Sequence, residues 1–443
     1  MKKYIITSYT PGTKVNEDAL NTLQFMADDI DAELLALPTK ANYKQLQNEF
    51  PDVILPTKGG FYLNDNLYIS DLLVNVNLGD PISGLESISS EMGSLVIAAP
   101  RHRFKSVARS LKHHKSPRGI WCTGTVSEPD YKDTKSGLRM RGYHVLGAIL
   151  VEVKNKEIFS IRQLTYSSDS KSVCDLNKEY TLSGEVSHIR PSISLGDLHP
   201  PFTSPSVLIA TKKLLKKLQV EKVMFHDSFD GASISHHVEG KHLTKALIQQ
   251  NLPSLEEEVQ LTQKVMNDVI SQAPEDSEFY VVKSNHDEHL DRYLDEFRFK
   301  IDYTNLLYAL HLTIQKVKFK RKEHTEDCLE FSLKEAGLDK RFVFLERDDK
   351  LDIAGIECSN HGDYGPNGAR GNAKSQGLAF TGGKTITGHA HTPEIGIYGN
   401  YVNGTMTHLT LPYTNDSGTS GWINSHTLIY PNGTMTHFHI IED

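Results

Sequence analysis

The sequence feature that most constrains the fold is a short apolar run that stops at Asp197-Leu198-His199. Residues 189–195 have the β-branched and aliphatic character of a buried strand, and Pro200-Pro201 ends the run. Side chains two apart at the end of an extended strand point the same way, so this Asp and His could hold one ion. An Asp after a strand is also a common turn residue, so the pair needs partners elsewhere in the chain.

Four further apolar runs end on side chains that can bind metals. They lead to His226-Asp227, to Asn285-His286-Asp287, to Asn360-His361 and to Gly388-His389-Ala390-His391. In an open α/β sheet, the carboxyl ends of the strands collect at one edge, where such sheets bind ligands. The five runs therefore predict an α/β protein in which these side chains meet.

The order of these motifs resembles the calcineurin-like metallophosphoesterase superfamily. Its signature reads Asp-x-His, Gly-Asp-x-x-Asp, Gly-Asn-His-(Asp/Glu), a single His and Gly-His-x-His, and the similarity runs from about residue 189 to the C-terminus. The resemblance implies a four-layer β-sandwich, with two β-sheets flanked by helices. Two glycines of the signature are replaced by His226 and Ser284, so those two turns could differ in shape.

Carried over position by position, the resemblance implies two metal ions and a catalytic imidazole. Asp197, His199 and His391 would hold the first metal, Asn285, His361 and His389 would hold the second, and Asp227 would bridge them. His286 would be the catalytic imidazole, oriented by Asp287.

The residue types fit that chemistry independently. Carboxylate, imidazole and amide ligands without thiolate suit hard to borderline divalent ions. We expect two divalent ions per chain. Mn²⁺ is the preferred ion, with Fe²⁺, Zn²⁺ or Mg²⁺ as alternatives. A bridging carboxylate brings such ions to ~3.5–4 Å, where they activate water and neutralise phosphate charge. His286 would give a proton to the leaving oxygen.

The composition is that of a globular protein. The 443 residues are 38% hydrophobic with a net charge of −8, and no apolar run approaches the ~20 residues of a membrane span. Residues 1–6 are too short an apolar start for a signal peptide. Four scattered cysteines (Cys122, Cys174, Cys328 and Cys358) form no C-x-x-C pair and favour a reducing compartment. We expect a cytoplasmic protein without membrane contact, in the host cytoplasm if it is phage-encoded.

The length predicts more than one domain. Residues 1–180 carry no part of the signature and are predicted to form an accessory α/β domain, with a boundary at the polar stretch 167–172. Strands are expected at 3–8, 94–99 and 144–153, and an amphipathic helix at 17–31. Residues 181–443 would form the phosphoesterase domain with helical insertions. The accessory domain could serve as a scaffold, bind substrate, contact a protein partner or form a homo-oligomer.

A basic segment in the accessory domain is a candidate DNA contact. Residues 101–118 contain seven basic residues and no acidic one: Arg101, Arg103, Lys105, Arg109, Lys112, Lys115 and Arg118. In an acidic chain, such a segment could touch a phosphate backbone. The alternative is a solvated helix face. Residues 316–322 show a second basic run and leave the same two alternatives open.

Two helical stretches and a repeat complete the pattern. Ser254 with Glu257 forms a capping box before a helix of about four turns, and residues 288–335 read as a long stretch whose leucines mostly pack in the core. The repeat Asn-Gly-Thr-Met-Thr-His occurs at 403–408 and 432–437 and predicts two β-hairpins. His408 and His437 would then lie on strand surfaces, and residues 418–422 would form a loop bordering the site.

The leading function is a Mn²⁺-dependent DNase. The run from Gly388 through His426 is similar to the end of the phage-encoded pre-early DNases. A small-molecule phosphoesterase acting on cyclic nucleotides or phosphomonoesters is one alternative. A non-catalytic interaction protein that keeps the fold is another, although a pure binding protein has no need of the full ligand set.

Overall fold

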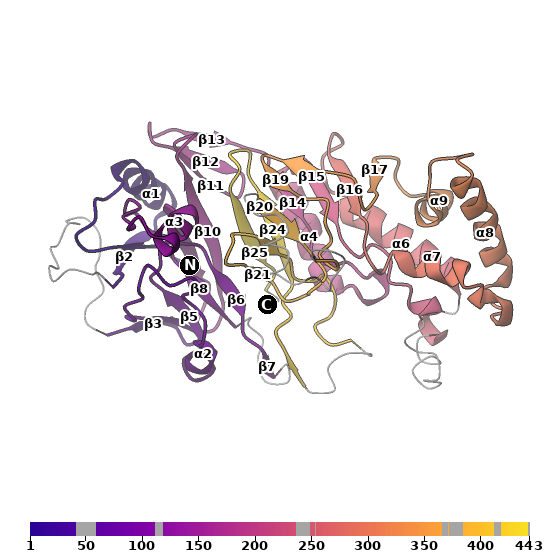
Figure 1. Cartoon of the computed structure of the whole chain (residues 1–443), viewed down its shortest axis with the longest axis horizontal. Coiled ribbons are helices and arrows are strands. Elements are labelled where there is room, and N and C mark those ends of the chain that lie inside the picture. The colour runs from indigo at the N-terminus through magenta and orange to yellow at the C-terminus, as the bar shows by residue number, and fades with distance from the viewer. Residues whose placement is uncertain are drawn as a thin grey trace.

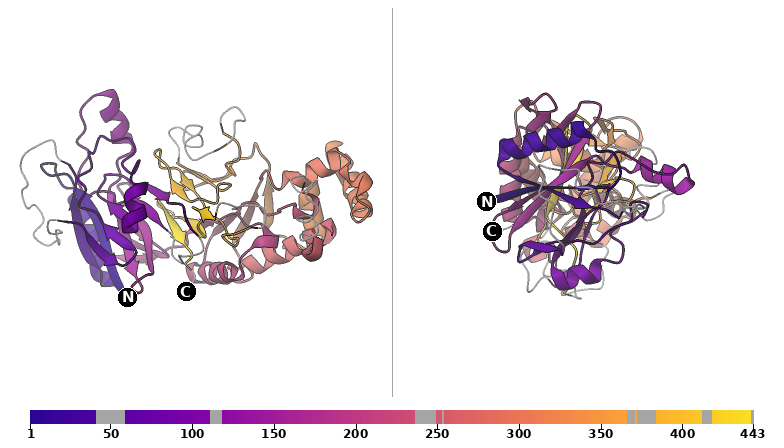
Figure 2. Two further views of the ribbon diagram at one scale, coloured as in Figure 1. Left: turned by 90° about the horizontal axis from the view of Figure 1, so that it is seen from below. Right: turned by 90° about the vertical axis from the view of Figure 1, so that its left-hand side faces the viewer.

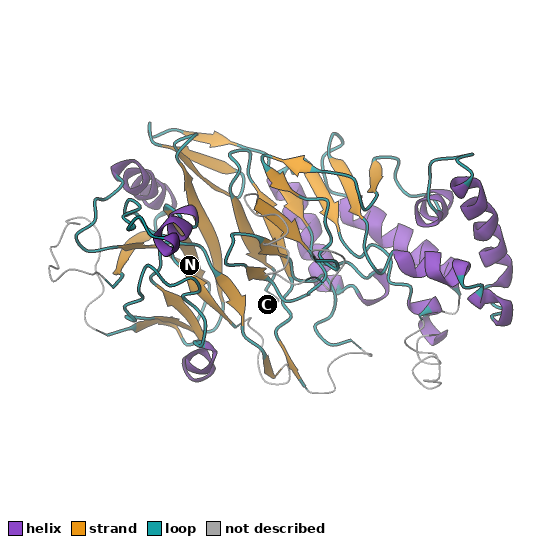
Figure 3. Ribbon diagram, in the orientation of Figure 1, coloured by secondary structure: helices purple, strands orange, loops and turns teal. Residues whose placement is uncertain are grey.

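The chain has a mixed α/β fold in which strands fill the middle of the molecule. The computed structural model describes residues 1–40, 59–110, 118–235, 249–252, 254–365, 371, 384–411 and 418–441. Figure 3 shows the strands in the centre, with one group of helices at each end. None of the described helices is long and apolar enough to cross a membrane.

A seven-stranded sheet is built from the first half of the chain. In sheet order, its strands are β13 (Val186–His188), β12 (Lys178–Thr181), β11 (Ser172–Asp175), β10 (Phe159–Ser167), β9 (Gly147–Val153), β1 (Lys2–Tyr9) and β2 (Glu33–Pro38). Helix α1 (Glu17–Ile30) covers one face with Leu23 and Met26. The Asn16 side chain caps this helix by accepting the Ala19 N–H, and Asp31 ends it in the left-handed region.

A six-stranded sheet comes from the second half. Its order is β17 (Phe342–Leu345), β16 (Glu278–Val282), β15 (Lys222–Phe225), β14 (Ser192–Ser194), β24 (Ser425–Ile429) and β25 (Met435–His439). The four strands from β14 to β17 are parallel, whereas β24 and β25 add antiparallel. Parallel strands need crossover connections, and helices supply these here.

A ten-stranded sheet joins the two halves of the chain. Its order is β18 (Asp352–Ile353), β19 (Ile356–Glu357), β20 (Lys384–Thr387), β22 (Tyr401–Val402), β21 (Glu394–Ile395), β6 (Phe104–Ser106), β8 (Gly119–Cys122), β5 (Ser94–Ile97), β4 (Leu67–Ile69) and β3 (Phe61–Asn64). The junction is the antiparallel pairing of β6 with β21. A small sheet, β7 (Arg109–Ser110) with β23 (Thr419–Ser420), also links the halves.

The remaining described helices are α2 (Glu86–Met92), α3 (Lys135–Gly142), α4 (Pro205–Leu218), α6 (Leu255–Ile270), α7 (Glu288–Asp295), α8 (Leu306–Lys320) and α9 (Cys328–Glu335), with short 3-10 turns η1 (Pro200–Phe202), η2 (Ala232–Ile234) and η4 (Arg298–Ile301). Of these helices, α2 and α3 lie toward one end of the molecule, α4 lies near the middle, and α6 to α9 lie toward the other end (Figure 1). Figure 2 shows α6 to α9 extending away from the N-terminal half.

The largest apolar clusters lie on the faces of the sheets. One packs α4, α6 and α7 against the six-stranded sheet, with Val223 and Phe279 at its centre. Another fills the space between strands of all three large sheets and contains Met224, Trp121 and Ile386. Met224 and Val223 are neighbours on β15, so this strand is buried on both faces, as its continuous apolar run indicates.

Most predicted elements of the first half are confirmed, and the polar stretch at which the domain boundary was placed is a hairpin turn. The strands expected at 3–8, 94–99 and 144–153 appear as β1, β5 and β9, and the helix expected at 17–31 is α1. The polar stretch 167–172 is the turn of an antiparallel hairpin, because Ser167 pairs with Ser172. The division at residue 180 stays a prediction, and the ten-stranded sheet crosses it.

The later predictions have mixed outcomes. The Ser254 hydroxyl caps α6 by accepting the Glu257 N–H, as expected. Asn432-Gly433 turns the β24–β25 hairpin, but Asn403 follows β22 without one, because the chain continues alongside Asp197 instead. His437 is fully buried rather than on a surface, whereas His408 is exposed. The stretch 288–335 breaks into α7, η4, α8 and α9.

Candidate metal centre

Strand ends from two sheets meet at one place. β14, β15 and β16 are parallel neighbours in the six-stranded sheet, and their ends carry Asp197, Asp227 and Asn285. β19 and β20 are parallel in the ten-stranded sheet and lead to His361 and to the pair His389 and His391. The site therefore lies where two sheets face each other, and not along one sheet edge as predicted.

Four side chains form its tightest group. Asp197, His199, Asp227 and His391 are buried, and one possible ligand atom from each lies within 4.8 Å of the others. His391 Nε2 is 3.1 Å from Asp197 Oδ2 and 3.0 Å from His199 Nε2. His199 Nε2 is in turn 3.1 Å from Asp227 Oδ2. Two imidazole nitrogens and two carboxylates that converge in this way can hold a cation.

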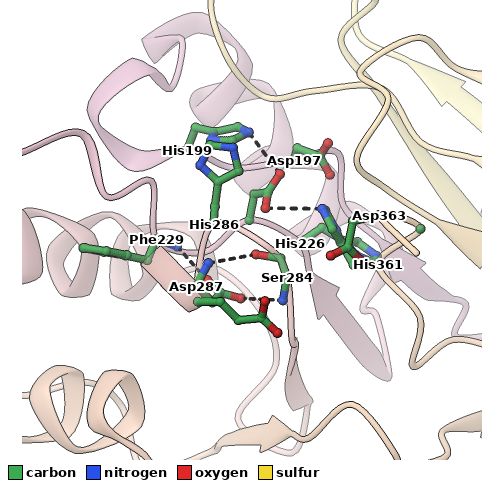
Figure 4. A network of polar contacts seen from close by, with 12 residues as sticks. Asp197, His199, His226, Phe229, Ser284, His286, Asp287, His361 and Asp363 are labelled. Atoms are coloured by element: carbon green, nitrogen blue, oxygen red, sulfur yellow. Dashed lines mark hydrogen bonds and ion pairs between the residues drawn. The ribbon is translucent and has the colours of Figure 1, made fainter. Parts of the chain in front are cut away.

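The two carboxylate oxygens of Asp227 face different imidazoles. Oδ2 lies beside His199, and Oδ1 is 3.3 Å from His361 Nε2. The His389 ring packs edge-on against His361, with ring centroids 5.4 Å apart. Asp227 is thus placed between two groups of candidate ligands. Figure 4 shows His199 and His286 close together and apart from His226 and His361.

Unpartnered buried atoms show that this arrangement fits metal ions. Polar atoms of Asp197, Asp227, Asn285, His361 and His391 are buried in the described structure without a hydrogen bond, although Asp197 Oδ2, Asp227 Oδ1 and His361 Nε2 lie 3.1–3.3 Å from an ion-pair partner. Such groups are rare in protein interiors, because losing water without a replacement costs free energy. A divalent ion would replace the lost water at each of these oxygens and nitrogens.

The backbone around the site is strained. His199, Asp227, His389 and His391 all have positive φ, at 43°, 46°, 72° and 56°. This region is unfavourable for residues with a Cβ, and it persists where surrounding structure forces it, often at functional sites. Gly388 allows a close approach at the same place, because a Cβ there would lie 2.2 Å from Asp197 Oδ1.

Charge at the site is balanced by protons in the metal-free protein. Burial disfavours protonation of His199, but Asp227 and Asp230 outweigh it and raise its pKa well above the usual value. Burial likewise opposes protonation of His361, yet Asp227 and Asp197 raise its pKa to about 9. Although burial opposes ionisation of Asp227, His361 and His199 lower its pKa well below the usual range. Metal ions would displace the protons from these imidazoles.

Asp230 is a functional candidate that the sequence analysis left without a role. Its Oδ2 is 2.7 Å from His199 Nδ1, and its carbonyl oxygen is 2.9 Å from His286 Nδ1. A carboxylate behind a metal-binding His fixes the ring and its tautomer. The signal was present, because the superfamily signature has a second Asp three residues after the first.

Asp287 does not orient His286, contrary to the prediction. Its carboxylate accepts the N–H groups of Phe229 at 3.1 Å and Ser284 at 3.0 Å, so it holds two loops together (Figure 4). Burial raises its pKa to about 6, and the charge of Asp227 adds to this. The His286 ring instead contacts Asp230, with its centroid 4.6 Å from that of His199.

The two departures from the glycine signature have different effects. His226 lies against the site, with Nδ1 3.3 Å from His361 Nδ1 and Nε2 3.0 Å from Ser194 Oγ. With Asp197 and His361 it forms a second group that could hold an ion, and burial lowers its pKa to about 4. The Ser284 hydroxyl accepts the Asp287 N–H at 3.1 Å. His226 is therefore a further candidate ligand that a glycine could not provide.

A cavity beside the site contains cationic side chains. It has a volume of about 440 Å³, and its lining includes His361, the cationic Arg347 and Lys350, and four acidic residues, Glu288, Asp348, Asp349 and Glu357. Arg347 holds Asp363 with two bonds of 2.8 Å, and Asp363 lies two residues after His361. Trp422, from the predicted bordering loop, packs against His391 with ring centroids 4.4 Å apart. No sequence motif pointed to Arg347.

The basic segment is only partly available to a nucleic acid. Arg101 and Arg103 are each 3% exposed and bind internal partners: Arg101 donates to the Val76 and Gly79 carbonyls, and Arg103 pairs with Asp80 and Glu394. Both arginines are therefore structural, which corrects their assignment as DNA contacts. In the described residues 101–110, the segment forms β6 and β7 and not the helix of the alternative. Lys105 (paired with Glu86), Arg109 and Arg118 are partly exposed, and Lys112 and Lys115 lie outside the described residues.

The chain is similar along nearly its whole length to a phage protein. It is 30% identical to protein A1 of Escherichia phage T5 in an alignment of 465 residues, which covers 98% of this chain and 81% of the phage protein. No protein-family model matches the chain.

Proposed function

The chain belongs to the family of Escherichia phage T5 protein A1, and we propose that it is a two-metal phosphoesterase that cleaves DNA phosphodiester bonds with Mn²⁺. The observation that carries the metal-dependent activity is the buried Asp227 carboxylate between His199 and His361. We further propose that the facing sheets are the four-layer metallophosphoesterase sandwich. Its place of action would be the cytoplasm of an infected host.

The proposed ligands divide around Asp227. One ion would be held by Asp197, His199 and His391. The other ion would be held by Asn285, His361 and His389, and Asp227 would be a ligand to both. When bound, two divalent ions would neutralise the charge on a phosphate group and make a water molecule more acidic. The absence of thiolates from this set favours Mn²⁺, with Fe²⁺, Zn²⁺ or Mg²⁺ as alternatives.

His286 is suited to proton transfer. Its Nδ1 lies 2.9 Å from the Asp230 carbonyl oxygen, which accepts only, so Nδ1 carries a hydrogen. The Asp230 carboxylate lies 3.7 Å from the same nitrogen. The proton available for transfer is therefore the one on the other ring nitrogen, Nε2, of the doubly protonated ring. Nε2 can then give its proton to the leaving oxygen as the P–O bond breaks and the bond from water to phosphorus forms.

The substrate class is supported by one feature. The C-terminal run from Gly388 to His426 is similar to phage pre-early DNases. The cavity beside His361 adds nothing to this, because acidic side chains outnumber Arg347 and Lys350 in its lining and Arg347 is paired with Asp363 and Glu288. Lys105 and Arg109 remain candidate contacts to a DNA backbone. No observation specifically favours a cyclic nucleotide or phosphomonoester.

The test is a matched set of hydrolysis assays. Purified protein is incubated with linear and circular DNA, and with a p-nitrophenyl ester series, in the presence of Mn²⁺, Mg²⁺, Zn²⁺ or chelator. We expect cleavage of DNA that requires metal and is lost in Asp227→Asn. Hydrolysis of the small esters alone would replace DNA by a small-molecule substrate, and metal loading without any hydrolysis would indicate a binding protein.

A further inference from the structure

A second cavity lies between the two halves of the chain, away from the candidate metal centre. It has a volume of about 660 Å³ and is lined by the segment between α3 and β9, by β10, and by β21, β22 and the turn between them. None of the candidate metal ligands is among the described residues that line it. Lys384 lines it at the start of β20, whereas His389 follows the end of that strand. The two sites therefore lie at opposite ends of β20, which is roughly 10 Å long.

The lining of this cavity carries an excess of positive charge. Among the described residues that line it are four cationic side chains and one carboxylate: Arg101, Arg103, Arg141, Lys384 and Glu128. Arg103 already pairs with two carboxylates outside the lining, and Arg141 pairs with one. Arg101 and Lys384 have no carboxylate partner among the described residues. The uncompensated charge of the cavity is therefore that of Arg101 and Lys384.

Arg101 is a buried cation. It is 3% exposed, and its guanidinium donates to the carbonyl oxygens of Val76 and Gly79 at 3.1 Å each. Its Nε has no hydrogen-bond partner, and burial lowers the pKa of the side chain. Buried charges in proteins are normally paired, because an isolated charge away from water is costly. A DNA backbone cannot reach this side chain, but a small anion inside the cavity would compensate its charge.

Lys384 gives the cavity a cation that a ligand can contact. The residue is exposed, and its Nζ donates to the Gly433 carbonyl oxygen at 2.5 Å. An ammonium group has three N–H donors, so two of them remain for a ligand. A phosphate group has the charge and the acceptor oxygens that match these donors.

Two tyrosines add an aromatic surface to the same cavity. Tyr143 follows α3, and Tyr398 lies in the turn between β21 and β22. Their rings pack edge to face, with centroids 5.7 Å apart. Both residues are half-buried, so the chain does not cover either ring completely. Any nucleobase can stack on an aromatic ring, because every base has a flat π-face.

The size of the cavity suits a small organic ligand. Small-molecule sites usually have volumes of ~300–1,000 Å³, and 660 Å³ lies within this range. A free phosphate ion would leave most of the cavity empty and would make no use of the tyrosines. A nucleoside without phosphate would leave the charge of Arg101 and Lys384 uncompensated. The lining therefore matches a ligand with one anionic end and one aromatic end.

From these observations we propose that the cavity between α3, β10 and β21 binds a nucleoside monophosphate. Its phosphate is held by the charge of Arg101 and Lys384, and its base stacks on Tyr143 and Tyr398. The proposal is independent of the proposed hydrolysis, because it uses no residue of the metal centre.

The first test is direct binding in the absence of metal. Calorimetric titrations of the full-length protein in chelator use dAMP, inorganic phosphate and deoxyadenosine as separate ligands. We expect dAMP to bind at one site per chain, about tenfold or more tightly than either of the other two, because each of them lacks half of the contacts. The proposal is overturned if dAMP does not bind, or if phosphate or deoxyadenosine binds as tightly.

Matched variants then locate the site. Lys384→Gln and Tyr398→Ala should each weaken dAMP binding by about tenfold, through loss of a charge and of a stacking surface respectively. The controls are Lys217→Gln on α4 and Tyr303→Ala before α8, which change exposed residues of the same types outside the cavity and should keep wild-type affinity. Wild-type affinity in both cavity variants would contradict the location.

Two further comparisons examine the buried charge and the metal centre. Arg101→Met removes the charge together with the bonds to Val76 and Gly79, so Arg101→Lys, which keeps the charge, is measured beside it. Weaker dAMP binding in Arg101→Met and recovery in Arg101→Lys are expected, with thermal unfolding as the check that both are folded. His286→Ala should bind dAMP as the wild type does. Loss of binding in His286→Ala would place the nucleotide at the metal centre and refute the proposal.

Discussion

Replacing Asp227 by Asn is the sharpest test of the metal centre. The change keeps the shape of the side chain but removes the charge that faces His199 at 3.1 Å and His361 at 3.3 Å. A neutral amide is a poor ligand between two cations, so we expect both metal content and turnover to fall together. Metal per chain is measured by mass spectrometry, and turnover is measured on the substrate that the wild type cleaves.

For the metal-free protein, the expected change in the free energy of unfolding follows from the pKa of His361. The rise of its pKa from 6.5 to about 9 corresponds to about 3 kcal/mol of stabilisation, at roughly 1.4 kcal/mol per pKa unit. Burial alone would lower this pKa, so the rise depends on the carboxylates, with Asp227 first among them. Breaking a buried charge pair usually costs ~3–5 kcal/mol, which is the same range.

The pH dependence gives the direction of the effect. Because the folded protein holds the His361 proton more tightly than the unfolded chain, this stabilisation is fully present below pH 6.5 and is lost as pH rises to about 9. In chelator, Asp227→Asn should therefore lower the free energy of unfolding by about 3 kcal/mol near pH 6, and by much less above pH 9. Denaturant unfolding at both pH values measures this.

A surface variant provides the control. Asp268→Asn makes the same chemical change at a partly exposed carboxylate that pairs with Lys212, and it should leave metal content and turnover unchanged. The assignment of Asp227 as a ligand shared by two ions is refuted if Asp227→Asn binds two metals per chain and hydrolyses substrate at the wild-type rate. A loss of stability that does not vary with pH would show that the pairing with His361 is misassigned.

Three further predictions concern other residues. His286→Ala should keep metal content near wild type and lower the rate of hydrolysis by a factor of about 10²–10⁴, the usual contribution of a general acid. Loss of metal from this variant would instead make His286 a ligand. Lys105→Glu with Arg109→Glu should flatten the salt dependence of DNA binding. The slope of log binding constant against log salt concentration should change by ~0.9 for each phosphate that is no longer neutralised. An equal fall in activity on DNA and on a small chromogenic ester would point to damage to the fold. Burial raises the pKa of Glu258 to about 7 from 4.5, so stability should fall as pH rises between these values, and Glu258→Gln should abolish that slope in urea unfolding curves.

The sequence by itself determined which strands are followed by polar side chains that could bind a metal. Four of the five apolar runs form the strands β14, β15, β16 and β20, since a run of β-branched and aliphatic residues that stops at a polar turn is a local signal. The fifth run, Ile353–Ile356, is the turn of the β18–β19 hairpin, and β19 leads on to His361. The cap of α6 was predicted for the same reason, because the Ser254 hydroxyl accepts a hydrogen bond from the backbone three residues on.

Long-range features were not readable in this way. The pairing of β6 with β21 joins residues nearly 300 positions apart. Neither short strand contains a sequence pattern that identifies the other as its partner. The charge of Arg103 looked available for DNA because basic residues usually lie on the surface. In the structure, Glu394 reaches Arg103 through that pairing, and Asp80 reaches it from the segment before α2. Asp287 was misassigned because proximity in sequence to His286 does not fix where a side chain points.

Helix α8 shows the same division most clearly. Its apolar residues are evident in the sequence, and helical spacing places them in rows. One row, which includes Leu307 and Ile314, is exposed, although the leucines of this stretch were expected to pack mostly in the core. Which row faces α7 and which faces solvent depends on how Lys316 meets Asp291 and Asp295, two residues of another helix. The sequence determined the strand ends, the cap of α6 and the ligand types. The tertiary structure decided which sheets face each other, which charges are buried and which apolar row remains exposed, because those outcomes depend on contacts between distant segments.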